Sequence, residues 1–330
     1  MSNGYFKVKS KKNLDELVLG DRIEESDFAT LTQSGNFVQL EYVENDEEIR
    51  NHEVSPGVWT IIKTPMGLAL QATSYSDDKI LDTFIHTQQY TERINKFFAR
   101  LDVYKKHGIE VPKRGALLYG PPGGGKSTLI TKIVKEYTAL KDTVIINWPT
   151  DVFEASVVKS FIKTFKYTEA CAKMILIVED IGGTEQDQGR ARSDSSLLSL
   201  LDNQEKTFTI PIYIIATTNF PENFLENLTN RPGRFDDKFN VSNPPKEFRA
   251  ALLEFFAKEM TTPEIMEEIK KDKYAGLTPA HIREVVIRAD IYEQTILQTL
   301  GEIVKEIEKF KNLFTNKKSS MSMIKDDFDD

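Results

Sequence analysis

The chain has 330 residues, of which 40% are hydrophobic and 28% charged, as is ordinary for a globular protein of one large domain or two moderate ones. Its 43 basic and 51 acidic residues give a net charge of −8, so most of the surface should repel nucleic-acid phosphates. The single cysteine, Cys171, excludes an internal disulfide framework. No stretch resembles a signal peptide or approaches the about 20 apolar residues of a membrane span. We therefore expect a soluble, cytoplasmic protein in which Cys171 is packed in a helix and is not a nucleophile.

Short strand-like segments separated by turn residues characterise positions 1–78. The segments lie at 36–43, 58–64 and 68–73. The turn residues Ser55-Pro56-Gly57 come just before the second segment, and Pro65-Met66-Gly67 separates the second from the third. This pattern predicts a small β-containing N-terminal domain. Nothing in its sequence indicates what the domain binds.

A different pattern covers positions 79–243. A helical segment at 79–110 is followed by apolar, strand-like runs at 116–119, 144–147, 174–178 and 212–216, with helical segments between them. Apolar strands that alternate with helices are typical of a parallel sheet with helices on both faces. We therefore predict an α/β core over these residues.

The remaining sequence predicts two further parts. After Pro244-Pro245 the pattern is helical to about residue 314, which indicates a small α-helical lid domain. From Thr315 the chain is rich in serine and ends in Asp-Asp-Phe-Asp-Asp, so we expect a disordered acidic tail over 315–330.

A phosphate-binding motif follows the first apolar strand of the core. It matches the pattern G-x-x-x-x-G-K-[ST] and consists of Gly120, Pro121, Pro122, Gly123, Gly124, Gly125, Lys126 and Ser127, with Thr128 next to it. The glycines allow the loop to approach phosphates closely, and its backbone N–H groups can point at the anion. Lys126 supplies a cation between the outer phosphates, and the Ser127 hydroxyl is suited to Mg²⁺. Because the motif lies between a strand and an amphipathic helix, it predicts nucleotide binding.

Polar residues end two of the later strands. The run 174–178 ends in Glu179 and Asp180, and the run 212–216 leads into Thr217, Thr218 and Asn219. The carboxyl ends of parallel strands meet at one edge of a sheet, so these groups should lie beside the phosphate loop. One carboxylate can hold the Mg²⁺ shell while the other orients or deprotonates the attacking water. The Asn219 amide can hydrogen-bond that water or the terminal phosphate.

Eleven residues after Asn219 comes the segment Asn-Arg231-Pro-Gly-Arg234-Phe-Asp. Together with GALLYGPPGGGKST at 115–128, ILIVED at 175–180 and IIATTN at 214–219, it closely resembles the AAA family of AAA+ ATPases in order and spacing. The resemblance covers about residues 79–300.

The resemblance implies a Mg²⁺-dependent ATP hydrolase that works as a homo-oligomeric ring, a hexamer in this family. It makes Arg231 and Arg234 arginine fingers that reach the terminal phosphate of ATP in the neighbouring subunit; a planar guanidinium suits the charge of that transition state. Most AAA+ proteins place Asp before Glu in the acidic pair. The order is reversed here, so Glu179 takes the magnesium position and Asp180 the water-activating position.

Within the family, the Glu-Asp order and the segment 108–115 are similar to the mitochondrial translocase of the folded Rieske protein. That relative has a membrane segment near its N-terminus and this sequence has none, so we expect its nearest relatives among soluble phage or bacterial proteins. The pore-loop aromatic of protein-threading members falls at Phe153, where a core phenylalanine is an equal alternative because the usual glycine is absent. In the lid, Pro279-Ala280-His281 replaces the family's Gly-Ala-Asp. Arg283 or His281 could face the nucleotide, and the alternative that we favour is a position on the lid surface.

Three functions are consistent with these motifs. The first is an ATP-driven ring that remodels or threads a protein client. The second is a nucleic-acid motor or loader, which the acidic charge and the lack of a recognisable DNA-binding module make the weaker hypothesis. The third is a slow nucleotide-gated scaffold or regulatory ring, which the reversed Glu-Asp pair suggests.

Overall fold

The computed structural model describes residues 28–34, 37–43, 53–64, 67–74, 87–149, 162, 166–181, 208–221 and 235–325. These residues belong to two compact units. The sheet unit contains the strands and the helices that precede Val241, apart from Pro121–Gly125. The helical unit contains Pro121–Gly125 and the chain from Ser242 onward.

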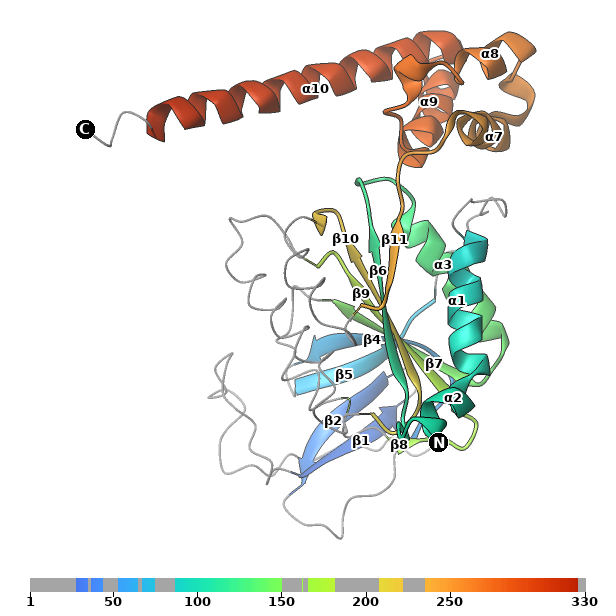
Figure 1. Cartoon of the computed structure of the whole chain (residues 1–330), viewed down its shortest axis with the longest axis vertical. Coiled ribbons are helices and arrows are strands. Elements are labelled where there is room, and N and C mark those ends of the chain that lie inside the picture. The colour runs from blue at the N-terminus through green and yellow to red at the C-terminus, as the bar shows by residue number, and fades with distance from the viewer. Residues whose placement is uncertain are drawn as a thin grey trace. The chain divides into compact units, whose positions relative to one another are not determined.

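One mixed sheet organises the sheet unit (Figure 1). Among the described residues it has nine strands in the order β1-β2-β5-β4-β7-β9-β10-β6-β11. Their bounds are β1 Phe28–Ser34, β2 Phe37–Val43, β4 Gly57–Thr64, β5 Gly67–Ala72, β6 Lys113–Tyr119, β7 Thr143–Pro149, β9 Lys173–Glu179, β10 Ile212–Thr218 and β11 Asp237–Asn240. A separate parallel pair joins β3 (Glu53–Val54) to β8 (Lys166–Tyr167).

Five neighbouring strands of the sheet are parallel, in the spatial order β7-β9-β10-β6-β11. This arrangement confirms the predicted α/β core. The four strands expected from apolar runs are β6, β7, β9 and β10, each slightly longer than its run. Their carboxyl ends are aligned, because Thr218 pairs with Tyr119 and Pro149 pairs with Glu179. This alignment brings the residues after each strand to one edge of the sheet.

The N-terminal strands are part of the same sheet. β4 pairs in parallel with β7, with Val58 opposite Ile145, and β5, β2 and β1 continue the sheet in antiparallel order. The sequence predicted a β-containing N-terminal domain over 1–78, and its β content is present, but its strands share a hydrogen-bonded ladder with the core. The N–H and C=O groups of β7 that β9 does not use provide the physical reason, because unpaired strand edges favour such additions. The boundary at residue 78 remains a prediction.

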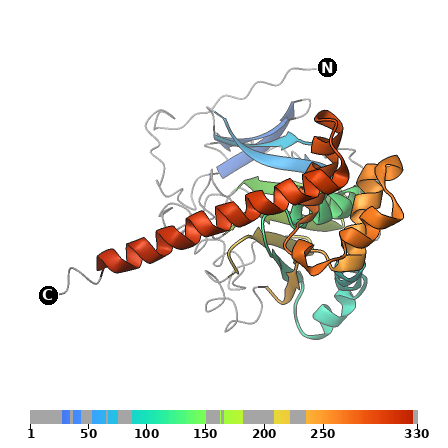
Figure 2. The same ribbon diagram turned by 90° about the horizontal axis from the view of Figure 1, so that it is seen from above.

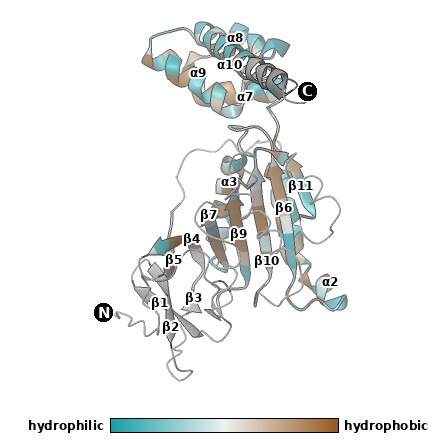
Figure 3. Cartoon of the chain, turned by 90° about the vertical axis from the view of Figure 1, so that its left-hand side faces the viewer, coloured by the Kyte–Doolittle hydropathy of each residue, from teal (hydrophilic) through white to brown (hydrophobic). Residues whose placement is uncertain are grey.

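Both faces of the central strands are buried. In β9, Met174, Leu176 and Val178 belong to one apolar cluster, while Ile175 and Ile177 are also inaccessible to solvent. Helices α1 (Thr87–Ala99), α2 (Leu101–Lys106) and α3 (Lys126–Ala139) lie on one face of the sheet (Figure 1). The apolar centre is visible as brown strands in Figure 3. Burial on both faces explains why these strands are continuous apolar runs in the sequence.

Cys171 is buried, as predicted, but it lies in a turn and not in a helix. Its backbone N–H donates to the Thr168 carbonyl at 2.8 Å, and its Sγ lies 3.1 Å from the Val54 carbonyl oxygen. The turn lies in the short connection between β8 and β9, which leaves no room for a helix. The expected helical position was therefore wrong.

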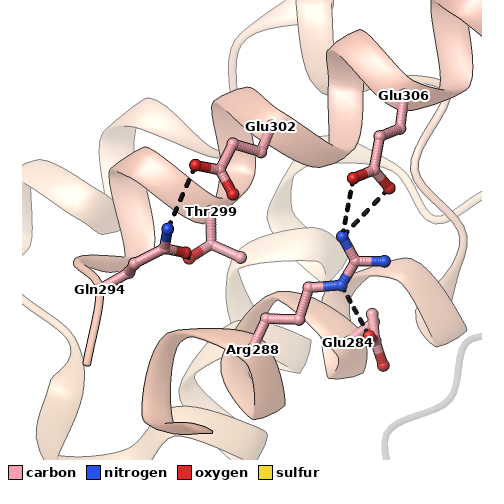
Figure 4. A network of polar contacts seen from close by, with 6 residues as sticks. All are labelled: Glu284, Arg288, Gln294, Thr299, Glu302 and Glu306. Atoms are coloured by element: carbon pink, nitrogen blue, oxygen red, sulfur yellow. Dashed lines mark hydrogen bonds and ion pairs between the residues drawn. The ribbon is translucent and has the colours of Figure 1, made fainter. Parts of the chain in front are cut away.

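The helical unit is built from four α-helices among its described residues. They are α7 (Lys246–Ala257), α8 (Pro263–Glu268), α9 (Pro279–Ile291) and α10 (Ile296–Lys325), with the short 3-10 helices η4 (Lys258–Met260) and η5 (Asp272–Tyr274) between them. Arg288 of α9 donates to Glu284 in the same helix at 2.7 Å and to Glu306 of α10 at 2.9 Å, so the second ion pair joins α9 to α10 (Figure 4). A buried arginine of α7, Arg249, donates to backbone carbonyls of four residues: Pro244, Ile269, Lys270 and Lys271.

The last helix is longer than the sequence suggested. α10 continues as one rod to Lys325 (Figure 2), whereas a disordered tail was expected from residue 315. The segment 315–325 contains neither proline nor glycine, so nothing in it interrupts helical hydrogen bonding once the helix has started. No helix within the described part of the chain is both long and apolar enough to cross a membrane.

Candidate active site

The phosphate loop joins the end of β6 to the start of α3, as the motif predicted. Gly120 has φ +152°, and a Cβ atom there would lie 2.2 Å from the Val241 carbonyl oxygen. Any larger residue at 120 would therefore collide with the backbone that follows β11. Farther along the loop, Gly123 has φ +73°, and a Cβ atom there would lie 3.0 Å from both Ala280 and Thr278 of the helical unit. Close packing, against backbone at Gly120 and against side chains at Gly123, thus explains two of the motif's glycines.

Lys126 begins α3 and is almost fully buried, with 7% of its surface exposed. Its Nζ donates to the Gly120 carbonyl at 2.8 Å and to Asn219 Oδ1 at 2.6 Å. Burial lowers the pKa of this ammonium group, and the nearby negative charge of Asp180 acts in the opposite direction. The cation is therefore held beside the loop by the polar end of β10. This is the position in which a lysine can bind the outer phosphates of a nucleotide.

Ser127 and Glu179 meet at the same edge of the sheet. The Ser127 hydroxyl donates to Glu179 Oε2 at 2.8 Å, although the two residues lie 52 positions apart in the sequence. A hydroxyl and a carboxylate oxygen are hard donors of the kind that Mg²⁺ accepts, and this ion is usually held by few protein ligands plus substrate phosphates and water. The pair therefore fits the predicted magnesium site.

Asp180 follows β9 in an unusual backbone conformation, with φ +56°. Its backbone N–H donates to Thr217 Oγ1 at 2.9 Å, and its Oδ1 accepts from Asn219 Nδ2 at 3.1 Å. Asn219 thus uses its amide oxygen for Lys126 and its amide nitrogen for Asp180. This orientation is the one that the chemistry requires, because an ammonium group only donates and a carboxylate only accepts.

The structure brings together the predicted residues Gly120, Lys126, Ser127, Glu179, Asp180 and Asn219 within the sheet unit. The intervening loop residues Pro121–Gly125 pack within the helical unit, where the Ala280 N–H donates to the Gly123 carbonyl at 3.3 Å. Thr128 is exposed in the first turn of α3. The predicted arginine fingers Arg231 and Arg234 and the candidate pore-loop residue Phe153 lie outside the described residues.

Two contacts, one in each unit, were not predicted. Thr217 was noted only as part of a strand end, yet its hydroxyl holds the backbone of Asp180. In the helical unit, Thr278 caps α9 and forms a capping box with His281, whose Nδ1 accepts from the Thr278 N–H at 3.1 Å. A Thr-Pro pair before a helical pattern is a recognised start signal, and it could have located this cap from sequence. Arg283 is exposed, consistent with the expected lid-surface position.

Comparisons with known proteins agree with this geometry. Residues 116–243 match the family described as "ATPase family associated with various cellular activities (AAA)". The chain is 31% identical over 242 residues to Protein HYPER-SENSITIVITY-RELATED 4 of Arabidopsis thaliana, an alignment that covers 67% of this chain and 39% of that protein. It is 28% identical to the 26S proteasome regulatory subunit 7 of Caenorhabditis elegans (63% of this chain, 51% of that protein). It is 27% identical to the proteasome-activating nucleotidase of Thermococcus onnurineus (72% and 61%).

The chain therefore spans less than two thirds of the length of each of these relatives. The family match begins within β6, includes the phosphate loop and the ends of β9 and β10, and finishes just after β11. It thus contains every described residue that the site brings together within the sheet unit. Residues 116–243 form an AAA ATPase domain.

Proposed function

We propose that the chain hydrolyses ATP to ADP and phosphate, with Mg²⁺, where β6, β9 and β10 end. The observation that carries this proposal is the continuous polar path from Lys126 through Asn219 to Asp180, with hydrogen bonds of 2.6 and 3.1 Å. The path connects a phosphate-binding cation to a carboxylate through one amide. Such an arrangement can align a water molecule with the terminal phosphate while the loop holds the phosphate in place.

Each side chain has a distinct part in the proposed mechanism. The loop amides, the start of α3 and Lys126 bind the phosphates, since all three present positive charge or N–H donors. Ser127 and Glu179 would hold Mg²⁺, and the ion would supply positive charge to neutralise the phosphate oxygens. Asp180 accepts a hydrogen bond from the attacking water and orients it. Asn219 hydrogen-bonds both the Lys126 ammonium group and the Asp180 carboxylate and so fixes their positions relative to each other.

We further propose that the working form is a homo-oligomeric ring, a hexamer as in the family that the motifs resemble. Charge develops on the phosphoryl oxygens during cleavage, and a second cation supplied in trans can be worth about 10³ to 10⁵ in rate. Arg231 and Arg234 are the candidates for this role. Mixing Lys126→Ala with Arg234→Ala tests it, because a mixed ring contains sites with an intact loop beside an intact arginine. Recovery of turnover above that of either variant is expected, and its absence would contradict the shared site.

The client is proposed to be a protein. Two of the relatives named above are a proteasome regulatory subunit and a proteasome-activating nucleotidase. The net charge of −8 also disfavours nucleic acid. We place the chain near soluble relatives of the Rieske-protein translocase branch, because its Glu179-Asp180 order and the segment 108–115 resemble that branch. Threading of the client past Phe153 remains a part of this proposal.

The decisive experiment for hydrolysis replaces Asp180 by asparagine. The amide keeps the size of the side chain but cannot take a proton from water, so we expect phosphate release to fall about 10²-fold to 10³-fold. ATP should still bind, because Lys126 and the loop are unchanged. Asp102→Asn, on the exposed helix α2, makes the same chemical change away from the site and should keep full turnover.

Undiminished phosphate release by Asp180→Asn would overturn the proposed role of Asp180 and with it the hydrolytic mechanism. The same variant tests the client, because a ring that binds ATP without cleaving it should retain what it acts on. Recovery of a protein with the trapped ring is expected. Recovery of DNA alone would reverse the choice of client.

A further inference from the structure

The conformation of Asp180 distinguishes it from the strand that it follows. Its φ of +56° lies in the left-handed region, which is uncommon for residues other than glycine and which aspartate and asparagine enter more readily than most. The other described non-glycine residues with positive φ are Lys141, Lys258 and Glu293, and each of these lies where a helix ends. Asp180 instead lies at the end of a buried strand inside the site. A strained residue in such a place persists only when its surroundings hold it there.

Two hydrogen bonds from the neighbouring strand hold this turn. Thr217 Oγ1 accepts from the Asp180 backbone N–H at 2.9 Å, and the Thr217 carbonyl accepts from the Ile181 N–H, also at 2.9 Å. The regular pairing of β9 with β10 ends one residue earlier, where Ala216 lies opposite Val178. The Thr217 side chain therefore takes over where the ladder stops. It is rigidly placed, because Thr217 is 1% exposed and β-branched in a central strand.

The turn matters because of the order of the acidic pair. An aspartate side chain is one methylene shorter than a glutamate, so the backbone must bring its carboxylate closer to the reacting water. The left-handed turn at Asp180 changes the direction in which the Cβ atom leaves the chain, and the carboxylate meets the Asn219 amide at 3.1 Å. A different residue at position 217, without a hydroxyl, would leave the Asp180 N–H without this acceptor.

We propose that the Thr217 hydroxyl is a positioning group for hydrolysis, which holds Asp180 in the left-handed turn so that its short carboxylate reaches the attacking water. The proposal rests on the proposed function, because it assigns Thr217 a role only through Asp180. It predicts an effect on the chemical step and not on nucleotide binding, since Thr217 makes no described hydrogen bond to Lys126, Ser127 or the loop.

The test replaces Thr217 by valine, which has nearly the same shape and keeps the strand packed. We expect kcat to fall roughly tenfold, the consequence of losing one well-placed hydrogen bond, while KM for ATP changes by less than about threefold. Thr217→Ser restores the hydroxyl and should restore kcat to within about threefold of the original protein. Thr143→Val is the matched control: Thr143 is also 1% exposed and its hydroxyl also makes one hydrogen bond, which it donates to Asp142, but it begins β7, at the opposite end of the strands from Thr217.

Four outcomes decide the matter. A Thr217→Val protein with unchanged kcat would refute the positioning role, and so would a Thr217→Ser protein that stays as slow as the valine variant. An equal loss in Thr143→Val would show that a buried threonine is needed for the fold alone. Asp180→Asn, measured alongside, separates failure of the proposed function from failure of the role of Thr217. If Asp180→Asn stays active, the proposed function fails. If Asp180→Asn is inactive and Thr217→Val is fully active, only the role of Thr217 fails.

Discussion

Replacing Arg249 by methionine removes a guanidinium group that holds several segments of the helical unit together. Arg249 lies in α7 and is 3% exposed. Its three nitrogens donate to the carbonyls of Pro244 at 3.2 Å, Ile269 at 3.0 Å, Lys270 at 3.0 Å and Lys271 at 3.1 Å. One side chain therefore satisfies the carbonyls just after α8 as well as one before α7.

The magnitude of the loss can be worked from these contacts. Each hydrogen bond from a charged donor is worth about 1.5–3 kcal/mol net, but the four are not independent. Carbonyls near the surface regain water after the substitution, and methionine keeps part of the apolar packing. We therefore expect the helical unit to lose about 3–5 kcal/mol of unfolding free energy, the range seen when one partner of a buried charged contact is removed. At about 1.4 kcal/mol per factor of ten, its opened population rises at least about 100-fold.

The assay must report on the helical unit alone. Both tryptophans of the chain, Trp59 and Trp148, lie in the sheet unit, so fluorescence would miss the change. Amide hydrogen exchange of α7, α8 and α9 measures it directly. Arg288→Met is the matched control, because Arg288 pairs with two glutamates on the same unit but its side chain is 30% exposed, and such pairs contribute about 1 kcal/mol or less. Equal exchange rates in the two methionine variants would refute the reasoning.

Three further predictions concern the loop, acid stability and the metal. Gly120→Ala should weaken ATP binding at least about tenfold, because its Cβ would lie 2.2 Å from the Val241 carbonyl oxygen. Gly301→Ala in α10 is the contrasting glycine substitution, because a Cβ there meets nothing described within 4 Å. It should raise the unfolding free energy by about 0.5–1 kcal/mol. Burial raises the pKa of Asp237, but its hydrogen bonds from Arg114 at 2.6 and 2.9 Å outweigh this and hold the pKa below the ordinary value. The stability that this contact provides is therefore present above about pH 4 and is lost as the pH falls further. Urea titrations of the original protein and of Asp237→Asn measure this effect. The difference between their unfolding free energies should become smaller below about pH 4. Chelation of Mg²⁺ should abolish phosphate release and its return should restore it; turnover that persists in excess chelator would contradict the assignment of the metal site.

Much of the core could be predicted from the sequence because burial on both faces leaves a strong signal. Continuous apolar runs mark the four strands β6, β7, β9 and β10. The phosphate loop is marked by its glycine, lysine and serine spacing, which is rare outside phosphate-binding sites. β11 could not be found in the same way, since its four residues are Asp-Lys-Phe-Asn and alternate too briefly to show a period. The pairing of β4 with β7 was also hidden, because a sequence does not state which strand edges meet.

The candidate site residues could be named from the sequence where chemistry fixes the residue type, and their roles stay predictions; residues whose part depends on geometry could not be named. Lys126, Ser127, Glu179 and Asn219 could be named because phosphate and magnesium demand a cation, a hydroxyl, a carboxylate and an amide at strand ends. Thr217 could not, because its role depends on the backbone turn of its neighbour in space and not on any spacing. The contact of Arg114 with Asp237 was invisible for a similar reason, since the two residues are 123 positions apart.

The shared ladder between β4 and β7 has a mechanical consequence. Four residue pairs, from Gly57–Val144 to Thr60–Asn147, join the two strands side by side. A force applied along β4 would load these pairs in shear, so their hydrogen bonds would have to break together and not one after another. The N-terminal strands should therefore be rigidly connected to the nucleotide-binding strands. Tension applied to the N-terminal strands would be transmitted directly to the sheet, because no flexible linker lies between β4 and β7 in the hydrogen-bonded ladder.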